Sequence, residues 1–347
     1  MKRLMHFFLF IACTFLTPLF CFSQHIKVTQ VKNQQKVAIT IDGKPFTFFC
    51  YPDSLPKPFL FPIYAPDGEV ITRGFPLEPR ANEPVDHPHH IGLWLNYENV
   101  NGLDFWNNSY AIPANKKSKY GWVRTTRIAF MKSGKDEGQL TYEANWTDIN
   151  NNVLLRESTT FIISTFGNAY IIDRITSLTA MQDVSMPDIK DGFLGLRVSH
   201  ELEIPSKEDR EFTDANGIVT KVKASDDKLP SGNYLTSTGK EGDSAWGTRA
   251  SWCMLYGKKG NDSISIAIID HPKNIGYPTY WHARGYGLFA ANPLGEKIFS
   301  NGKESLNFSL KKDEDVRFRY RIVINSAKQL LTSENISNLA QQFRSLY

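Results

Sequence analysis

The stretch KVAITIDGKPFTFFC, residues 36–50, decides the fold class that the sequence predicts. Alternating residues stand on both sides of the pair Asp42-Gly43: Val37, Ile39 and Ile41 before it, and Phe46, Phe48 and Cys50 after it. Alternation with a period of two is typical of a half-buried strand. Glycine tolerates the positive φ of a tight turn, so we expect a β-hairpin here.

The same pattern of short alternating runs and turn residues continues along the chain. Further strands are predicted at residues 125–131, 139–146, 153–163, 169–179, 193–203, 251–256, 263–269 and 316–324. The 13% aromatic residues suit pleated, half-buried surfaces. No alternation of strands with helices appears, which argues against a parallel doubly wound sheet. We therefore expect an all-β protein, in which residues 24–347 form one domain of two large, packed antiparallel sheets.

Two segments depart from this pattern. At about residues 332–346, apolar residues recur at spacings of three and four, and Thr332 or Ser333 can cap a helix there. This C-terminal helix is expected to cover an edge or a face of a sheet. Residues 206–242 are polar and rich in Gly, Ser, Lys and Asp. They predict a long excursion with little regular structure, either an insertion, which we favour, or a lid.

The N-terminus has the features of an export signal. Lys2 and Arg3 precede an apolar run at residues 7–20, and Cys21 and Ser23 are small residues before a cut at Gln24. We expect residues 1–23 to be removed and the protein to be periplasmic or secreted. No other apolar stretch approaches the length of a membrane span, so stable membrane insertion is not expected afterwards.

The charge of the mature chain argues against nucleic acid as a partner. Removing Lys2 and Arg3 lowers the number of basic residues from 40 to 38, against 36 acidic ones. No basic run stands out, so nucleic acid is not an expected partner.

Cys50 and Cys253 remain in the mature chain, each in an apolar strand-like run. Export permits a disulfide between them, and two buried free thiols are an equally good interpretation.

The densest group of chemically active side chains is DHPHHIGLWLNYENVNGLDFW, residues 86–106. Three of the eight histidines fall within it, and histidine acts as base, acid or metal ligand near neutral pH. If residues 90–96 are extended, Ile91, Leu93 and Leu95 share a core face, and His90, Gly92, Trp94 and Asn96 share the other face. Asn101-Gly102 predicts a tight turn, after which Asp104 and Trp106 would point the same way.

This segment supplies most of the candidate site. His87 and His90 are candidate acids or bases, and Trp94, Asn96, Asn101, Asp104 and Trp106 are candidate contacts for a polyhydroxylated ring. A structural alternative remains open: histidines beside a proline can bond backbone carbonyls, and both tryptophans can belong to the core. We favour functional use for the cluster as a whole.

Three other stretches add candidates. In residues 271–295, Tyr280, His282 and Arg284 share one face, and Asn292 lies nearby; His282 would take the acid–base role opposite to that of His87 or His90. Arg73 is a candidate clamp for hydroxyl or carboxylate groups. In residues 192–203, Arg197 and Glu201 fall on a polar face. Arg197 is a candidate substrate contact, and Glu201 is a candidate acid or base. His200 falls on the apolar face and is expected to be a core histidine.

Metal and nucleotide cofactors receive limited support. His87 and His89 could ligate a divalent metal, with a third ligand from His282 or Asp104, because a catalytic zinc typically has three protein ligands. The spacing does not demand such a site. The sequence has no GxGxxG, P-loop or GxSxG motif.

Long motifs give the chain a family resemblance. DHPHHIGLWL (86–95), VNGLDFW (100–106), DGFLGLRV (191–198) and HPKNIGYPTYWHARGYGLFAANPLG (271–295) resemble the exported bacterial proteins known as PmoA-like, which are named after a methane-oxygenase subunit. The resemblance extends from about Val37 to about Ile324. It implies a galactose-mutarotase-like supersandwich, a fold used by aldose epimerases, polysaccharide lyases and glycosidases. It implies no particular reaction.

The leading functional hypothesis is an exported carbohydrate-active enzyme, an isomerase, lyase or hydrolase, that acts on a glycoside or modified sugar by histidine-based proton transfer. The alternative is a non-catalytic carbohydrate-binding protein on the same fold. A metal-dependent oxygenase, as the family name suggests, ranks third, because an integral membrane subunit does not fit a chain without predicted spans.

Overall fold

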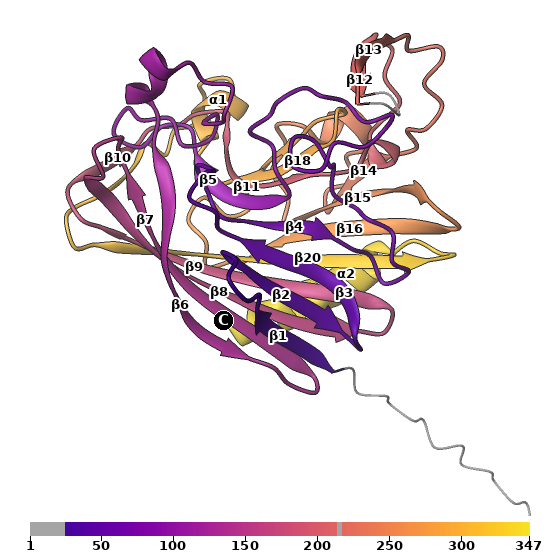
Figure 1. The fold of residues 1–347 in the computed structure, drawn as a ribbon, viewed down its shortest axis with the longest axis horizontal. Coiled ribbons are helices and arrows are strands. Elements are labelled where there is room, and N and C mark those ends of the chain that lie inside the picture. The colour runs from indigo at the N-terminus through magenta and orange to yellow at the C-terminus, as the bar shows by residue number, and fades with distance from the viewer. Residues whose placement is uncertain (1–24, 214–216) are drawn as a thin grey trace, which may run out of the picture.

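A computed structural model describes residues 25–213 and 217–347. The predicted signal segment, residues 1–23, lies outside the described residues. Two large antiparallel sheets face each other and enclose the main core (Figure 1). The predicted all-β architecture of two packed sheets is therefore confirmed.

The first sheet has eight strands in the order β1-β2-β3-β4-β5-β11-β18-β17. The strands are β1 (Ile26–Gln30), β2 (Lys36–Ile41), β3 (Lys44–Cys50), β4 (Phe59–Ile63), β5 (Leu93–Tyr97), β11 (Gly192–Arg197), β18 (Leu288–Asn292) and β17 (Tyr280–Ala283). Both sequence clusters with candidate site residues contribute strands to this sheet.

The second sheet also has eight strands, in the order β14-β15-β16-β20-β9-β8-β7-β6, and all of them except β14 are longer than the strands of the first sheet. They are β14 (Asn233–Thr236), β15 (Trp252–Lys259), β16 (Asp262–Asp270), β20 (Asp315–Ala327), β9 (Ala169–Ala180), β8 (Val153–Phe166), β7 (Glu137–Thr147) and β6 (Trp122–Lys132). Each predicted strand from 125 to 179 and from 251 to 324 overlaps one of these.

Short elements complete the fold. Two further strand pairs are β10 (Val184–Met186) with β19 (Phe308–Leu310) and β12 (Arg210–Thr213) with β13 (Val219–Val222). The helices are η1 (Ala114–Lys119), η2 (His200–Leu202), η3 (Gly242–Ala245), α1 (Glu296–Phe299) and α2 (Ser333–Leu346). The expectation of little regular structure in residues 206–242 is wrong, because β12, β13 and β14 lie there.

The hairpin at residues 36–50 is present, but a β-bulge changes its burial pattern. The pairing of β2 with β3 shifts register, so Phe46 and Phe49 are the buried phenylalanines. Phe48 and Cys50, which were expected to share the face of Phe46, are only half-buried. A bulge adds one residue to one strand and thereby inverts the faces beyond it.

The predicted parity is confirmed within β5 but not before it, because Ile91 packs in the same apolar cluster as Trp94 and not with Leu93 and Leu95. Leu93 and Leu95 pack into the main core between the sheets, whereas Trp94 packs into a separate apolar cluster on the opposite face. The strand itself begins at Leu93, not at the expected His90, because Gly92 has a φ of 57° and its carbonyl oxygen accepts a hydrogen bond from Arg197 N.

Cys50 and Cys253 are both free thiols. Cys253 is fully buried, and Cys50 is half-buried and contacts the carbonyl oxygen of Phe61 through Sγ at 3.5 Å. Burial raises the pKa of both thiols, that of Cys50 to about 11. Of the two interpretations of the cysteines, the structure therefore supports unpaired thiols.

The predicted C-terminal helix is confirmed as α2, which covers the outer face of the second sheet (Figure 1). Ile336, Leu339 and Phe343 are its buried residues, and they pack in a cluster with Trp252. No helix in the described residues is long and apolar enough to span a membrane.

The cap of α2 gives the first testable prediction. Thr332 Oγ1 accepts a hydrogen bond from the backbone N–H of Asn335 at 3.1 Å, and the Asn335 side chain bonds back to the backbone N–H of Thr332. Thr332→Ala removes this cap, so we expect the free energy of unfolding in urea to fall by about 1 kcal/mol. Ser337→Ala, at an exposed position of the same helix, is the matched control and should leave stability nearly unchanged.

Candidate functional site

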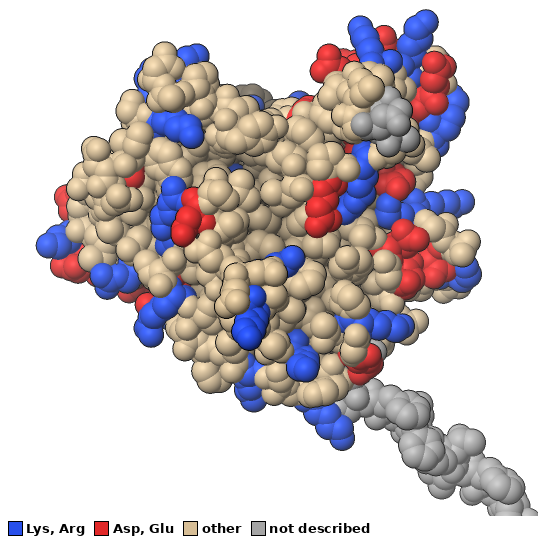
Figure 2. Space-filling view, viewed as in Figure 1, with Lys and Arg blue, Asp and Glu red and all other residues tan. Residues whose placement is uncertain are grey.

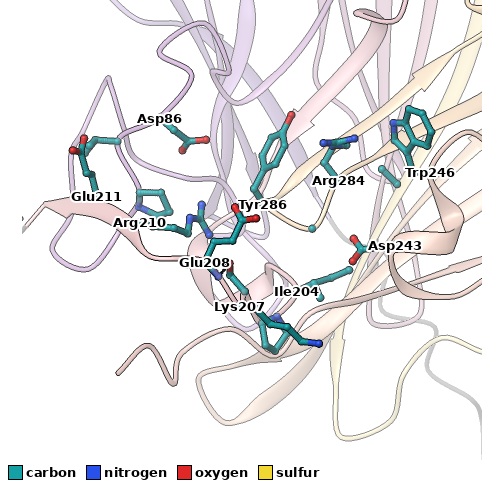
Figure 3. A pocket seen from close by; sticks show the side chains of 16 residues that line it. Asp86, Ile204, Lys207, Glu208, Arg210, Glu211, Asp243, Trp246, Arg284 and Tyr286 are labelled. Carbon is teal, nitrogen blue, oxygen red and sulfur yellow. Dashed lines mark hydrogen bonds between the residues drawn. The ribbon is translucent and has the colours of Figure 1, made fainter. Parts of the chain in front are cut away.

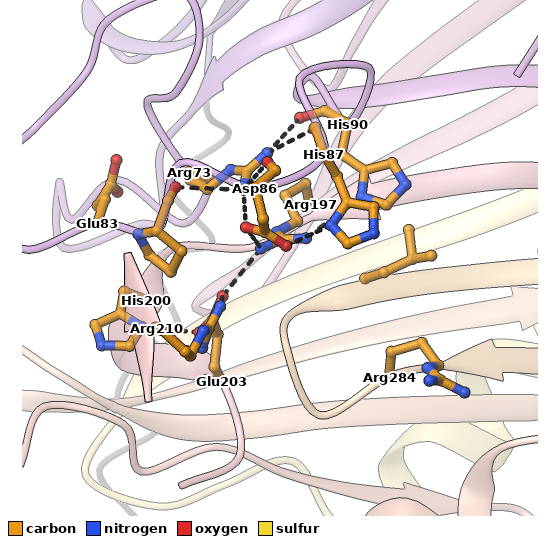
Figure 4. Close-up of polar contacts among 12 residues, drawn as sticks. Arg73, Glu83, Asp86, His87, His90, Arg197, His200, Glu203, Arg210 and Arg284 are labelled. Carbon is orange, nitrogen blue, oxygen red and sulfur yellow. Dashed lines mark hydrogen bonds and ion pairs between the residues drawn. The ribbon is translucent and has the colours of Figure 1, made fainter. Parts of the chain in front are cut away.

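Arg73 fixes the backbone of the loop that carries the histidine cluster (Figure 4). Its guanidinium donates hydrogen bonds to the carbonyl oxygens of Asp86 at 2.8 Å, His87 at 3.0 Å and His90 at 3.3 Å. It also donates to Asp86 Oδ1 at 2.7 Å. Arg73 is 1% exposed, so it positions the loop and is not the substrate clamp that the sequence suggested.

Arg197, at the end of β11, joins the same network from the sheet. Its Nη2 donates to Asp86 Oδ1 at 2.8 Å and to Glu203 Oε1 at 3.4 Å, and its Nη1 lies 3.3 Å from His90 Nδ1. Burial alone would raise the pKa of Asp86, but Arg197, the bond to His87 and Arg73 together hold it well below its usual range. Asp86 is therefore a carboxylate at neutral pH.

His87 is the histidine that this network presents at the surface. Its Nδ1 bonds to Asp86 Oδ2, and its ring stacks on those of His90 and Tyr286, with centroids 4.9 and 5.0 Å away. Its side chain is 41% exposed. His87 has a φ of 45°, an unfavourable backbone conformation for a residue with a side chain, and such strain is concentrated at functional sites.

Behind this loop, Glu203 continues the network away from Arg197. It accepts from Arg210 at 2.5 Å and pairs with His200 Nδ1 at 2.8 Å, and the other ring nitrogen of His200 contacts Asp227 at 2.9 Å. His200 is buried with both ring nitrogens partnered, which confirms its predicted place as a core histidine. Burial would lower its pKa, but Glu203 and Asp227 raise it overall.

The raised pKa of His200 gives a prediction for stability against pH. The stability that it contributes is fully present below the unfolded pKa of histidine and is lost as the pH rises through its higher folded value. We expect the difference in unfolding free energy between the wild type and His200→Gln to be largest near pH 6 and to shrink at alkaline pH. Denaturant unfolding from pH 5.5 to 9 measures it; a difference that grows with pH would contradict the assignment.

A cavity of about 800 Å³ opens beside this network (Figure 3). It is lined by residues 84–86, 204–208, 210–211 and 283–286, with Asp243 and Trp246. In the space-filling view the surface dips between the prominence that carries β12 and β13 and the prominence that carries η1 (Figure 2). Residues 206–208 and 210–211, at the start of the excursion, form part of the cavity wall.

The chemistry of the cavity wall is mixed. Arg284 lies between two aromatic rings, with its guanidinium carbon 5.7 Å from the centroid of Trp246 and 5.6 Å from that of Tyr286 (Figure 3). Glu208, Glu211 and Asp243 add carboxylates, and Lys207 adds a cation. Flat rings beside hydrogen-bonding groups form a surface suited to a polyhydroxylated ligand.

Four of the central residues predicted from the sequence are not accessible. His90 and His282 are 2% and 1% exposed, and Trp94 and Trp106 are completely buried. Burial lowers the pKa of both histidines, that of His282 to about 3. Neither tryptophan can stack on a ligand, because both pack in an apolar cluster with Phe59 and Phe61. For the tryptophans, the structural alternative was correct.

The other predicted residues have structural partners outside the cavity. Asn96 donates to the carbonyl oxygen of Phe105, Asn101 forms the predicted turn and bonds to Asp183 and Ser185, and Asp104 accepts from Asn107. Tyr280 bonds to Glu304, Asn292 donates to the carbonyl oxygens of Ile189 and Lys190, and Glu201 pairs with Lys259 at 2.5 Å. Arg284 is the predicted residue that lines the cavity.

The proposed metal ligands do not form a metal site. Within residues 25–213 and 217–347, no group of three or more His, Cys, Asp or Glu side chains is placed to hold a metal. His87 Nδ1 is occupied by Asp86, and the His89 ring packs edge-on against those of His87 and His90. Burial lowers the pKa of His89 to about 2.

Several residues of the network were not predicted. Glu203 in the network and Trp246 in the cavity wall were not predicted, and no local pattern marks them; Tyr286 lies in the second motif beside Arg284 but was given no role. Asp86 begins the histidine motif, so its position directly before His87 was a signal that could have been used. Lys57 was also missed: it is buried, its Nζ donates to the carbonyl oxygen of Trp106 at 3.0 Å, and burial lowers its pKa to about 7.

Residues 36–341 match DUF6807, described as a family of unknown function. The chain belongs to this family. The match covers both histidine-bearing motifs and all sixteen strands of the two large sheets except β1. No curated protein matches the sequence. The resemblance to PmoA-like proteins stays an expectation from the sequence motifs.

Solved structures with a similar architecture include carbohydrate enzymes. The GH36 α-galactosidase AgaB of Geobacillus stearothermophilus has a TM-score of 0.39 and 10% identity over 87% of this chain and 41% of that chain. Galactose 1-epimerase of Lactobacillus acidophilus has a TM-score of 0.34 and 11% identity, over 87% of this chain and 98% of that chain. Heparan sulfate lyase HepC of Pedobacter heparinus has a TM-score of 0.27 and 7% identity, over 89% of this chain and 36% of that chain. The chain spans about two fifths of the α-galactosidase, and these likenesses concern architecture alone.

Proposed function

We propose that this protein is a carbohydrate-active enzyme in which His87, oriented by Asp86, transfers protons to or from a glycoside or modified sugar bound in the adjacent cavity. The observation that carries the proposal is the position of His87. It is exposed, it is paired with a carboxylate, and its ring stacks on Tyr286 in the wall of an 800 Å³ cavity.

The hydrogen-bond pattern defines the protonation state that His87 would use. An ionised carboxylate only accepts hydrogen bonds, so the Nδ1 bonded to Asp86 carries the proton. In the neutral ring, Nε2 is then an unprotonated acceptor. It has no hydrogen-bonding partner among residues 25–213 and 217–347, and it can take a proton from a ligand. A carboxylate behind the imidazole also stabilises the cation that forms.

The cavity wall supplies the remaining features that a sugar requires. Trp246 and Tyr286 line the cavity, and Arg284 between them can donate hydrogen bonds to ring or hydroxyl oxygens. Glu208, Glu211 and Asp243 can accept from hydroxyl groups. The solved structures named for a galactosidase, an epimerase and a lyase suggest the same substrate class, and the proposal does not depend on them.

A non-catalytic carbohydrate-binding protein is the second candidate, and one observation favours it. His90 and His282, which were expected to share the acid–base work with His87, are both buried. A binding site needs the aromatic and polar wall of the cavity but no pair of titrating groups.

A turnover screen separates the two candidates. The mature protein is incubated with disaccharides, uronides and keto-sugars, with and without a chelator, and products are analysed by mass spectrometry beside Trp246→Ala and Arg284→Gln. We expect a product that is formed by the wild type and reduced in both variants. Binding without any product across the panel would establish the binding protein, and neither binding nor product would overturn both.

The proposed function includes export of the protein from the cytoplasm. We propose that residues 1–23 direct the chain to the periplasm or outside the cell, where complex carbohydrates are accessible. N-terminal sequencing of the protein recovered from its native host checks this: a mature N-terminus at Gln24 is expected, and a retained Met1 would contradict it.

A further inference from the structure

Arg284 is a cation in the cavity wall whose charge has no acceptor in the chain. It directly follows β17, and its backbone is fixed by a hydrogen bond from its N–H to the carbonyl oxygen of Leu288 at 2.8 Å. Its side chain is half-buried and lines the cavity. Its guanidinium forms no hydrogen bond or ion pair with residues 25–213 or 217–347, and no dashed line reaches it in Figure 4. Arg210, the other arginine of the cavity wall, is by contrast paired with Glu203.

The two aromatic rings beside Arg284 do not replace that acceptor. The guanidinium carbon lies 5.7 Å from the ring centroid of Trp246 and 5.6 Å from that of Tyr286. A ring face attracts a cation, but it provides no oxygen for the N–H groups along the edge of a guanidinium. The hydroxyl group of Tyr286 is likewise without a hydrogen-bonding partner in the described part of the chain. The cavity wall therefore holds a positive charge and a hydroxyl donor that are both available to a ligand.

The acids of the cavity wall do not exclude an anion. Asp86 is bound by the buried guanidinium groups of Arg73 and Arg197, at 2.7 and 2.8 Å, which compensate its charge. The three other acids that line the cavity are exposed: Glu208, Glu211 and Asp243. Water and salt screen exposed charges more strongly than half-buried ones. The unpaired charge of Arg284 therefore acts on a ligand in the cavity with less screening than the charges of these acids.

We propose that the ligand of this cavity is an acidic sugar, a uronide, whose carboxylate binds Arg284. The planar fork of a guanidinium can donate to both oxygens of a carboxylate at once, which gives a stronger contact than a hydroxyl group does. Tyr286 contacts both Arg284 and His87, so a uronide held by Arg284 lies beside the proposed proton-transfer group. This inference rests on the proposed function, in which the cavity binds the sugar, and it adds the substrate class.

The test compares each uronide with its methyl ester, which keeps the sugar and removes the charge. Isothermal titration calorimetry at low ionic strength measures the binding of the methyl glycosides of glucuronate and galacturonate, and of their methyl esters, to the mature His87→Ala protein. This background prevents conversion during the titration. We expect at least one uronide to bind about tenfold more tightly than its ester, because hydrogen bonds between charged groups are the stronger ones.

Variants made in the same background assign this ratio to Arg284. In Arg284→Gln, which removes the charge, uronide and ester should bind equally, and in Arg284→Lys, which keeps the charge but not the fork, the ratio should be intermediate. Arg156→Gln removes an exposed arginine of β8 that does not line the cavity, and it should keep the full ratio. A purely structural role of Arg284 would weaken both ligands and leave their ratio unchanged. Thermal unfolding confirms that each variant is folded.

Three results would overturn the inference: neither uronide binds more tightly than its ester, the ratio persists in Arg284→Gln, or glucose 6-sulfate binds while neither uronide does. Failure of the proposed function is a different result. In that case the wild type forms no product from any sugar in the turnover screen, while the ratio between uronide and ester and its loss in Arg284→Gln persist.

Discussion

His87→Ala is expected to lower the turnover number by about 10²- to 10⁴-fold on any sugar that the wild-type protein converts, which is the usual contribution of a general acid or base. The reason is geometric: His87 is exposed, its Nδ1 bonds to Asp86, and its ring stacks on Tyr286 in the cavity wall. Steady-state kinetics with the substrate from the screen measures the effect.

The matched control for this change is His25→Ala. His25 is also exposed, with Nδ1 bonded to the carbonyl oxygen of Gly134, but it lies at the start of β1, far along the chain from the site. The turnover number of His25→Ala should equal that of the wild type. Equal turnover in His87→Ala and the wild type would remove His87 from the chemistry, whatever else the cavity binds.

Arg197→Ala should lower the free energy of unfolding by about 1.5–3 kcal/mol, the usual contribution of hydrogen bonds to charged groups. The substitution removes the buried cation between the carboxylates of Asp86 and Glu203, which keep Arg73 and Arg210 as partners. Urea unfolding measures the loss, and the loop of residues 84–91 should become accessible to protease in the same variant.

Arg127→Ala provides the contrast. Arg127 binds both carboxyl oxygens of Glu143, at 2.8 and 2.5 Å, but its side chain is 63% exposed. Exposed ion pairs contribute about 0–1 kcal/mol, so this variant should remain close to the wild type. Similar losses of unfolding free energy in Arg197→Ala and Arg127→Ala would contradict the claim that burial makes the ion pairs of Asp86 more important for stability than an exposed ion pair.

The fold was predictable where local pattern and packing agree. The Asp42-Gly43 turn, the long strands of the second sheet and the apolar stripe of α2 each follow from a period of two or 3.6 in the sequence. The bulge in β3 was not predictable, because a single extra residue leaves the same alternation of letters and only the partner strand reveals the shift. In the excursion, polar composition concealed β12 to β14.

The site was predictable only in part, because burial is decided by distant segments. The motif around His87 identified a loop that lies beside the cavity, and Arg284, a predicted ligand contact, lines the cavity. Trp94 and His282 lie on the predicted face of their strands, yet other segments cover that face and bury both side chains. Residues 204–211 and Trp246 form the cavity wall from a region that carries no motif, so no reading of local spacing could have included them.

The most direct test of the account is a crystal structure of the protein with the sugar identified in the turnover screen, using the His87→Ala variant to prevent conversion. The account predicts the sugar ring in the cavity lined by Trp246, Arg284 and Tyr286, with Arg284 bonded to its oxygens and a reacting atom within hydrogen-bonding reach of the position vacated by the His87 imidazole. A sugar bound elsewhere on the protein, with the cavity beside Asp86 empty, would contradict it.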